Sequence, residues 1–383
     1  MMMNKKAIPK GYKQTKIGVI PVEWSLMRTD KVLERIRKKV EVENTTLYQQ
    51  IGIRSHAKGI FHKELVSGEI LGNKSVFWIE EDCFIVNIVF AWEQAVAKTT
   101  HAEKGLIASH RFPMYQPKNN QVDIDYILYF FKSKRGKYLL GLASPGGAGR
   151  NKTLGQKEFA ELKIPIPALK EQQKIAKILT TWDRAIERQE ALILAKEEFK
   201  KGLMQRLLSG DFKKLKFELI FNRVAGKKYQ INAKEYLREG KYPVIDQGKK
   251  KIIAYSNNNK KVFKNMSIIL FGDHTRTIKY IDFDFIVGAD GTQLLETKEN
   301  FDNKFFYYQL LNKKIPNTGY NRHFKFIKEM TFNVPPLKEQ QKIAQILTTT
   351  DKEIELLKNE LEVLKEQKQG LMQRLLMGEV RCI

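Results

Sequence analysis

The chain has 383 residues, of which 42% are hydrophobic and 10% aromatic, a balance typical of folded globular domains rather than of disordered segments. No run of residues approaches the roughly 18 consecutive apolar residues of a membrane-spanning helix, and we expect no secretion signal, because the first residues lack an apolar core. Only Cys83 and Cys382 occur. That count excludes a disulfide framework and a cysteine zinc site, and it leads us to expect a reducing, cytoplasmic setting.

The net charge of +25 is concentrated in two separate blocks. Residues 1–168 hold 27 basic and 16 acidic residues, a net of +11, and residues 212–336 hold 24 and 12, a net of +12. Residues 169–211 and 337–383 together hold 17 basic and 15 acidic residues and are nearly neutral. This distribution indicates two modules that dock on a polyanion, joined by elements with another task, although basic surfaces also serve solubility alone.

An internal repeat with an offset of 168 residues defines the neutral elements. The eight residues 169–176, Leu-Lys-Glu-Gln-Gln-Lys-Ile-Ala, recur unchanged at 337–344, and 25 of the 42 positions from 169 to 210 match their partners. Pro167 and Pro335-Pro336 precede the two copies, and Gly210 and Gly378 close them. Because proline is tolerated at a helix start and glycine favours a helix end, each copy predicts one long helix.

Both copies carry apolar residues at alternating spacings of four and three, from Ile175 to Leu207 and from Ile343 to Leu375. Kept up over about five heptads, this spacing predicts a coiled-coil seam on helices of roughly 60 Å. The 125 residues between the copies permit an antiparallel pair within one chain. An intermolecular coiled coil is the alternative, and the near-identity of the copies favours pseudo-twofold pairing inside the chain. The first seam is interrupted by Gln189, Lys196 and Lys200.

The two basic blocks alternate strand-like runs with helical stretches. Runs rich in β-branched and aromatic residues occur at 76–79, 83–86, 267–271 and 283–287, and helical patterns at 123–132 and 305–311. We therefore interpret each block as an α+β domain.

Several motifs of the chain are characteristic of a known family. They are Gly-Val-Ile-Pro-Val-Glu-Trp at 18–24, Ile-Pro-Ile-Pro-Ala-Leu-Lys-Glu-Gln at 164–172, Val-Pro-Pro-Leu-Lys-Glu-Gln at 334–340, and Gly-Leu-Met-Gln-Arg-Leu-Leu at the end of both helices. Gly272–Arg276 with Gly288–Gly291 is similar to one class of the family's second recognition domain. Over essentially its whole length the chain resembles the specificity subunits of type I restriction–modification enzymes.

The resemblance implies an α+β fold in which two target-recognition domains, residues 1–168 and 212–336, are joined by two long antiparallel coiled-coil helices, residues 169–211 and 337–383. Each recognition domain of such a subunit reads half of a split, asymmetric site in double-stranded DNA. The helices set the distance between the halves and hold two modification (methyltransferase) subunits. The resemblance further implies a non-catalytic chain without a cofactor of its own: S-adenosylmethionine, ATP and Mg belong to the methyltransferase subunits and to an ATP-driven restriction (translocase) subunit.

Basic and hydrogen-bonding residues at turns are the candidate DNA contacts, because arginine reads guanine, asparagine reads adenine, and lysine binds phosphates. A structural turn or a flexible linker is the alternative for each of them. The candidates are Arg54, His56, Lys58, His110, Arg111, Arg150, Asn151 and Lys152 in the first block, and His274, Thr275, Arg276, Tyr320, Asn321 and Arg322 in the second.

The polar residues that open both helices are identical in the two copies. Solvated helix faces explain them, and so do docking sites for the methyltransferase subunits, which the duplication favours. These candidates are Lys170, Glu171, Gln172, Gln173, Lys338, Glu339, Gln340 and Gln341.

Catalytic motifs are weak. His274 lies beside Asp273 and Arg276, but one pentapeptide supplies no nucleophile–histidine–acid set, and the six histidines have no metal-ligand spacing. The glycine-rich segment 144–153 lacks the Gly-Lys-Ser/Thr order of a nucleotide loop. A self-contained DNA-modifying enzyme is therefore disfavoured. A sequence-independent nucleic-acid-binding coiled-coil adaptor is the alternative function, and it gives no reason for two dissimilar basic modules.

Overall fold

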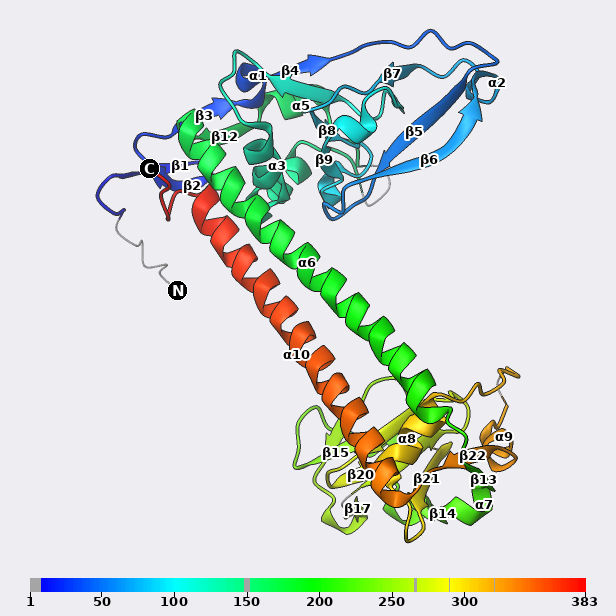
Figure 1. Cartoon of the computed structure of the whole chain (residues 1–383). Helices are drawn as coiled ribbons and strands as arrows, with labels where there is room; N and C mark the ends of the chain where they lie inside the picture. The colour runs from blue at the N-terminus through cyan, green and yellow to red at the C-terminus, as the bar shows by residue number, and fades with distance from the viewer. Residues whose placement is uncertain (1–7, 148–151, 265–266, 289, 320) are drawn as a thin grey trace. The chain divides into compact units, whose positions relative to one another are not determined.

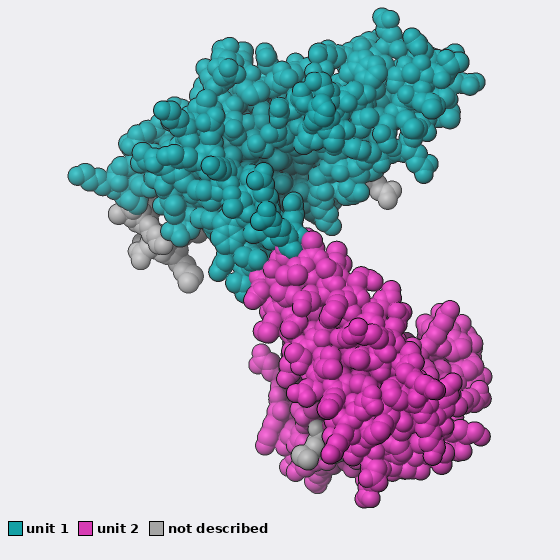
Figure 2. Space-filling view, in the orientation of Figure 1, with its two compact units in different colours: residues 1–188, 361–383 teal, residues 189–360 magenta. Residues whose placement is uncertain are grey.

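The computed structural model describes residues 8–147, 152–264, 267–288, 290–319 and 321–383. The chain divides into two compact units: unit 1 comprises residues 1–188 and 361–383, and unit 2 comprises residues 189–360 (Figure 2). Each unit therefore contains one α+β domain together with one half of each long helix. Among the described residues, no helix is long and apolar enough to cross a membrane.

The repeat forms two helices of 40 residues each, α6 (Leu169–Leu208) and α10 (Leu337–Leu376). After α10 the chain turns at Gly378, whose φ of +71° is the left-handed conformation that glycine adopts without strain. Within each unit the two helix halves run side by side (Figure 1).

Contacts inside each unit fix the relative direction of the two helices. In unit 1, Ile175 near the start of α6 shares a core with Leu375 near the end of α10. In unit 2, Leu203 near the end of α6 shares a core with Ile343 near the start of α10. The start of one helix thus meets the end of the other in both units, which confirms the predicted antiparallel pair.

The α+β domain of unit 1 is built from two four-stranded sheets and two two-stranded ribbons. The sheets have the strand orders β6-β5-β10-β7 and β4-β11-β8-β9, and the ribbons are β1-β2 and β12-β3. The strands are β1 (Tyr12–Thr15), β2 (Gly18–Pro21), β3 (Ser25–Arg28), β4 (Leu33–Ile36), β5 (Leu47–Ile53), β6 (Ile60–Ser67), β7 (Val76–Trp78), β8 (Phe84–Val86), β9 (Val96–Lys98), β10 (Ile107–Ser109), β11 (Met114–Pro117) and β12 (Lys163–Ile166). The helices are α1 (Thr29–Val32), α2 (Gly68–Leu71), α3 (Ile124–Lys132), α4 (Lys134–Leu142) and α5 (Gln156–Glu161).

Unit 2 repeats this plan. Its sheets have the orders β16-β15-β20-β17 and β14-β21-β18-β19, and its ribbon is β13-β22. Among the named strands, the one parallel pairing described in each unit joins β5 to β10 or β15 to β20. The strands are β13 (Lys213–Lys216), β14 (Phe221–Val224), β15 (Tyr242–Ile245), β16 (Ala254–Ser256), β17 (Val262–Phe263), β18 (Ile268–Gly272), β19 (Ile278–Ile281), β20 (Phe285–Val287), β21 (Thr292–Thr297) and β22 (Thr331–Val334). The helices are α7 (Phe217–Ile220), α8 (Asn303–Leu311) and α9 (Phe324–Lys328). The predicted pair of α+β domains is confirmed.

In each unit one largely buried helix connects the sheets to the long helices. The side chain of Asp123, the N-cap of α3, accepts the Tyr126 amide at 2.9 Å, and that of Asp302, the N-cap of α8, accepts the Phe305 amide at 2.7 Å. Aromatic side chains of both helices are buried in the cores that also contain the apolar ends of α6 and α10. Packing of these side chains therefore holds each domain on its part of the helix pair.

Candidate DNA interface

The first three candidate contacts of unit 1 lie in the turn between β5 and β6. Arg54, His56 and Lys58 lie at the surface of this turn. The Arg54 guanidinium lies over the Phe61 ring at 4.7 Å and donates to the carbonyl of Ile60 at 3.2 Å. His56 has a φ of +59° and its amide donates to the carbonyl of Glu93 at 2.7 Å. The turn is thus held in one shape with its basic side chains on the surface.

A second turn, between β10 and β11, presents His110 and Arg111, which are exposed. The carbonyl of Arg111 accepts the amide of Ile88 at 3.0 Å, and the carbonyl of Ile88 accepts the amide of Leu154 at 2.8 Å. Lys152 has its ammonium 5.5 Å from the centre of the Trp92 ring. The two other candidates of that loop, Arg150 and Asn151, lie outside the described residues.

The segment from Asn87 to Gln94 therefore brings the three groups of unit 1 candidates together. Glu93 binds the β5–β6 turn, Ile88 binds the turn of Arg111, and Trp92 contacts Lys152. Sequence reasoning did not select this segment, because it carries no basic residue of its own. Its role is visible only in the backbone hydrogen bonds.

In unit 2 the turn after β18 depends on Gln247, a residue that sequence reasoning also missed. The Gln247 amide oxygen accepts the His274 amide at 3.0 Å, and its amide nitrogen donates to the carbonyl of Asp290 at 2.8 Å. A side chain at Gly272 or Gly291 would collide with Gln247, since an added Cβ would lie 2.8 Å or 2.5 Å from its nearest side-chain atom. The two glycine-containing motifs are thus one structure, with Gln247 between them.

Asp273 connects this turn to the loop before α9. Its buried carboxylate accepts the Phe324 amide at 2.8 Å, and its carbonyl accepts both the amide and the ring Nδ1 of His323 at 2.9 Å. This places Arg322 beside His274 on a polar cleft of about 670 Å³. The cleft is also lined by Arg223, Lys227, Gln230, Asp290 and Gln293.

The other unit 2 candidates differ in whether their side chains are exposed or bonded to backbone carbonyls. Thr275 donates through Oγ1 to the carbonyl of Gln247 at 2.5 Å, and Arg276 donates to the carbonyl of Ile315 at 3.3 Å. These two side chains stabilise the turn from within. Asn321 and Arg322 are exposed, and Tyr320 lies outside the described residues. For all of these residues, contact with DNA stays a prediction.

At the helix starts, three of the eight predicted docking residues are buried: Glu171, Gln172 and Gln340. Glu171 accepts from the Trp24 indole at 3.0 Å and from Arg381 at 2.8 Å. For these three residues an internal role replaces the expected surface role. Lys170, Gln173, Lys338, Glu339 and Gln341 are exposed, and docking of a partner there stays a prediction.

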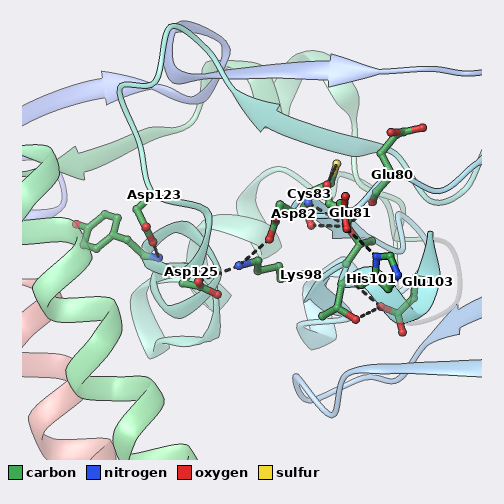
Figure 3. A network of polar contacts seen from close by, with 12 residues as sticks. Glu80, Glu81, Asp82, Cys83, Lys98, His101, Glu103, Asp123 and Asp125 are labelled. Carbon is green, nitrogen blue, oxygen red and sulfur yellow. Dashed lines mark hydrogen bonds and ion pairs between the residues drawn. The ribbon is translucent and has the colours of Figure 1, made fainter.

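The acidic residues near β8 and β9 form a network that fastens loops of unit 1 (Figure 3). The Lys98 ammonium lies 3.1 Å from Asp82 and 2.9 Å from Asp125, so it joins β9 to α3. Glu103 accepts the Thr100 amide at 2.8 Å and closes a capping box. In the part of the chain that the structure describes, no group of three or more His, Cys, Asp or Glu residues is placed to hold a metal. These carboxylates therefore act as structural acceptors.

Comparison with known proteins points to type I restriction–modification specificity subunits. The family model for the type I restriction modification DNA specificity domain matches twice, at residues 21–195 and 210–366. The chain is 25% identical to the putative type I restriction enzyme MjaX specificity subunit of Methanocaldococcus jannaschii, covering 97% of both chains, and 24% identical to the MjaVIII specificity subunit of the same organism, covering 94% of both. In fold it is similar to the crystal structure of a type I restriction–modification S subunit from M. genitalium, with a TM-score of 0.60, 17% identity, and coverage of 92% of this chain and 96% of that chain.

Proposed function

The chain belongs to the family of type I restriction–modification specificity subunits, and we propose that each of its α+β domains reads one half of a split site in double-stranded DNA. DNA sequence specificity is the role of this family. The observation that carries the proposal is the duplication of the plan: both units have the same strand orders and their domain segments carry similar positive charge, +11 and +12. Two positive domains of one plan fit two sites on one polyanion.

Different surface loops on the same plan support an asymmetric site. Unit 1 presents the turns with His56 and Arg111, whereas unit 2 presents the cleft between His274 and Arg322. Because the groups that read base edges differ, the two half-sites differ in sequence. The cleft's arginine and glutamine side chains are of the types that distinguish guanine and adenine in the major groove.

The chain assembles with methyltransferase subunits, two for a pseudo-twofold chain, and with a restriction subunit. The duplicated, exposed residues Lys170, Gln173, Lys338 and Gln341 supply two equivalent surfaces for equal partners. The chain catalyses no reaction of its own: S-adenosylmethionine, ATP and Mg are bound and used by the partner subunits. Asp273, the acid beside His274, is already bound to a backbone amide, which supports a structural use of that pair. A sequence-independent adaptor is not favoured, because the family is defined by DNA specificity.

The test is selection of bound duplexes from a randomised pool by the full chain, with its methyltransferase partner present, followed by sequencing. We expect a consensus in two parts separated by a spacer of fixed length and free sequence. Arg322→Ala should relax one half only, by roughly 1–3 kcal/mol at the position it reads. A flat sequence profile, or methyl transfer by the chain alone, would overturn the proposal.

A further inference from the structure

A lysine of unit 2 occupies a buried position in its strand, where an apolar residue is expected. Along β19, Lys279 and Ile281 are buried, and the residues between and before them are half-buried. Because alternate residues of a strand share one face, Lys279 occupies a core-facing position at 7% exposure. A buried ammonium is costly unless it is paired and hydrogen-bonded, so its partners reveal what this position does.

The partners of Lys279 all belong to the turn between β15 and β16. Its ammonium donates to the carbonyl of Asp246 at 2.7 Å and to the carbonyl of Lys250 at 2.6 Å, and it lies 3.8 Å from the Asp246 carboxylate. That carboxylate also accepts the Gly248 amide at 2.8 Å. Burial lowers the pKa of Lys279, and the charge of Asp246 opposes that change. One buried side chain thus joins residues 246 and 250 of this turn.

The turn carries three consecutive exposed lysines, Lys249, Lys250 and Lys251, which we call the lysine turn. Three adjacent ammonium groups repel one another, and fixing them on one short turn costs further free energy. The same segment contains Gln247, which binds the His274 amide and the Asp290 carbonyl. The lysine turn therefore begins two residues after a side chain that is bonded to two lining residues of the polar cleft, His274 and Asp290.

We propose that the lysine turn is a phosphate-binding surface for the DNA backbone beside the cleft, and that Lys279 is the positioning residue that keeps it ordered before DNA arrives. The inference rests on the proposed function. A turn that is already ordered in the free protein loses little conformational freedom when it binds DNA. A mobile turn would lose more, so it would bind more weakly even if its lysines reached the same phosphates. Phosphate contacts carry no sequence information, so this surface sets position while the cleft reads bases.

The contact is tested by the salt dependence of duplex binding by the full chain, on a selected site and on an unrelated duplex. The triple variant K249Q/K250Q/K251Q should flatten the plot of log K against log salt by about 0.9 for each phosphate that the protein no longer neutralises. Both duplexes should be affected alike, and the selected consensus should not change. The matched control K177Q/K342Q/K352Q removes three exposed lysines of the long helices and should leave the slope as it is. Equal slopes for the triple variant and the control would overturn the contact.

The positioning role is tested separately by Lys279→Met. We expect binding to weaken several-fold with the slope retained, because the three lysines still reach phosphates but must be ordered on binding. In the free protein, trypsin should cut at Lys249–Lys251 faster than in the wild type while thermal unfolding stays cooperative. Unchanged affinity together with unchanged cleavage would overturn the role of Lys279. If the wild type selects no sequence but the triple variant still flattens the slope, the proposed function fails and the phosphate surface stands.

Discussion

Gln172 and Gln340 are the same residue of the repeat, and they make the same bonds. Gln172 accepts the Asp123 amide at 2.9 Å and donates to the Pro167 carbonyl at 2.9 Å. Gln340 accepts the Asp302 amide at 2.9 Å and donates to the Pro335 carbonyl at 2.8 Å. Since the two aspartates are the N-caps of α3 and α8, each glutamine fastens a domain helix to the start of a long helix. Attachment of each domain to its long helix thus explains why glutamine occurs at this position in both copies of the repeat.

Replacing either buried glutamine by alanine should therefore destabilise the chain. Q172A and Q340A each remove the partner of a half-buried amide and of a buried carbonyl, which costs about 1–3 kcal/mol. The neighbouring exposed residues supply matched controls, since Q173A and Q341A should change stability by less than about 0.5 kcal/mol. Urea unfolding of the four variants measures the difference. Similar losses at the buried and exposed positions would contradict this account.

Glu171 and Glu339 are also equivalent in sequence, but their surroundings differ. Burial opposes ionisation of Glu171, yet hydrogen bonds from Arg381, Trp24 and the amide of Cys382 outweigh it and hold its pKa below the usual value. Glu339 is exposed. A lowered folded pKa stabilises the fold above the ordinary carboxyl pKa, and that stabilisation is lost as the pH falls through the lowered value.

E171Q should consequently destabilise the chain at neutral pH and reduce its loss of stability on acidification. E339Q should do neither. Unfolding midpoints between about pH 3 and pH 7 test the pair. The interpretation fails if E171Q retains the full acid dependence of the wild type.

At the scale of the elements, the lysines that interrupt the first seam have acidic partners on the other helix. Lys200 lies 2.5 Å from Asp351, and its repeat equivalent Lys368 pairs with Asp183. Each aspartate also accepts a tyrosine hydroxyl from the domain helix, from Tyr129 at 2.6 Å in unit 1 and from Tyr308 at 2.8 Å in unit 2. Lys196 pairs with Glu353 at 2.9 Å. These charges match only in one antiparallel register, so they specify the pairing of the helices.

A double-mutant cycle on Asp183 and Lys368 should show coupling. D183N and K368M should each destabilise by about 1–3 kcal/mol, and the double variant should lose less than their sum by about 1 kcal/mol or more. The pair Glu198–Lys201, whose side chains are 76% and 67% exposed, is the control and should couple by less than about 0.5 kcal/mol. Equal coupling in the two pairs would show that the seam pair does not specify the register.

The sequence predicted the helices well because their signals are local. Proline, glycine and the seven-residue spacing depend on neighbours along the chain. In contrast, Asp351, the partner of Lys200, and Asp123, whose amide Gln172 accepts, lie more than 40 residues away in sequence. The sequence likewise marked Gly272 and Gly291, but both pack against Gln247, a polar residue with no local pattern around it. Lys279 was missed for the same cause: a lysine in a short strand looks solvated until its carbonyl partners are known.

At the scale of the whole molecule, the structural repeat includes the domains, whereas the near-identical residues are confined to the helices. The near-identical residues end with the helices, yet the two domains share their strand orders and the parallel pairing in corresponding sheets. Sheet order depends on pairings distant along the chain and tolerates different side chains that keep the alternation of buried and exposed positions. Gap-free matching of the two halves finds the near-identical helices, whereas the duplication of the domains is read from the strand orders, and the loops on that backbone differ between the units.

This division between a duplicated frame and divergent loops predicts what a longer helix pair would do. Seven residues inserted after Arg188 and seven after Glu360 enter both helices at the same level, since Gln189 and Glu360 lie 3.1 Å apart. Seven residues add about 10.5 Å and nearly two whole turns, so the seam and the facing of each domain are kept. The preferred spacer should lengthen by about three base pairs at roughly 3.4 Å each, while both half-site sequences stay the same. Selection and sequencing of bound duplexes measures both quantities, and a change in either half-site would contradict the separation of spacing from reading.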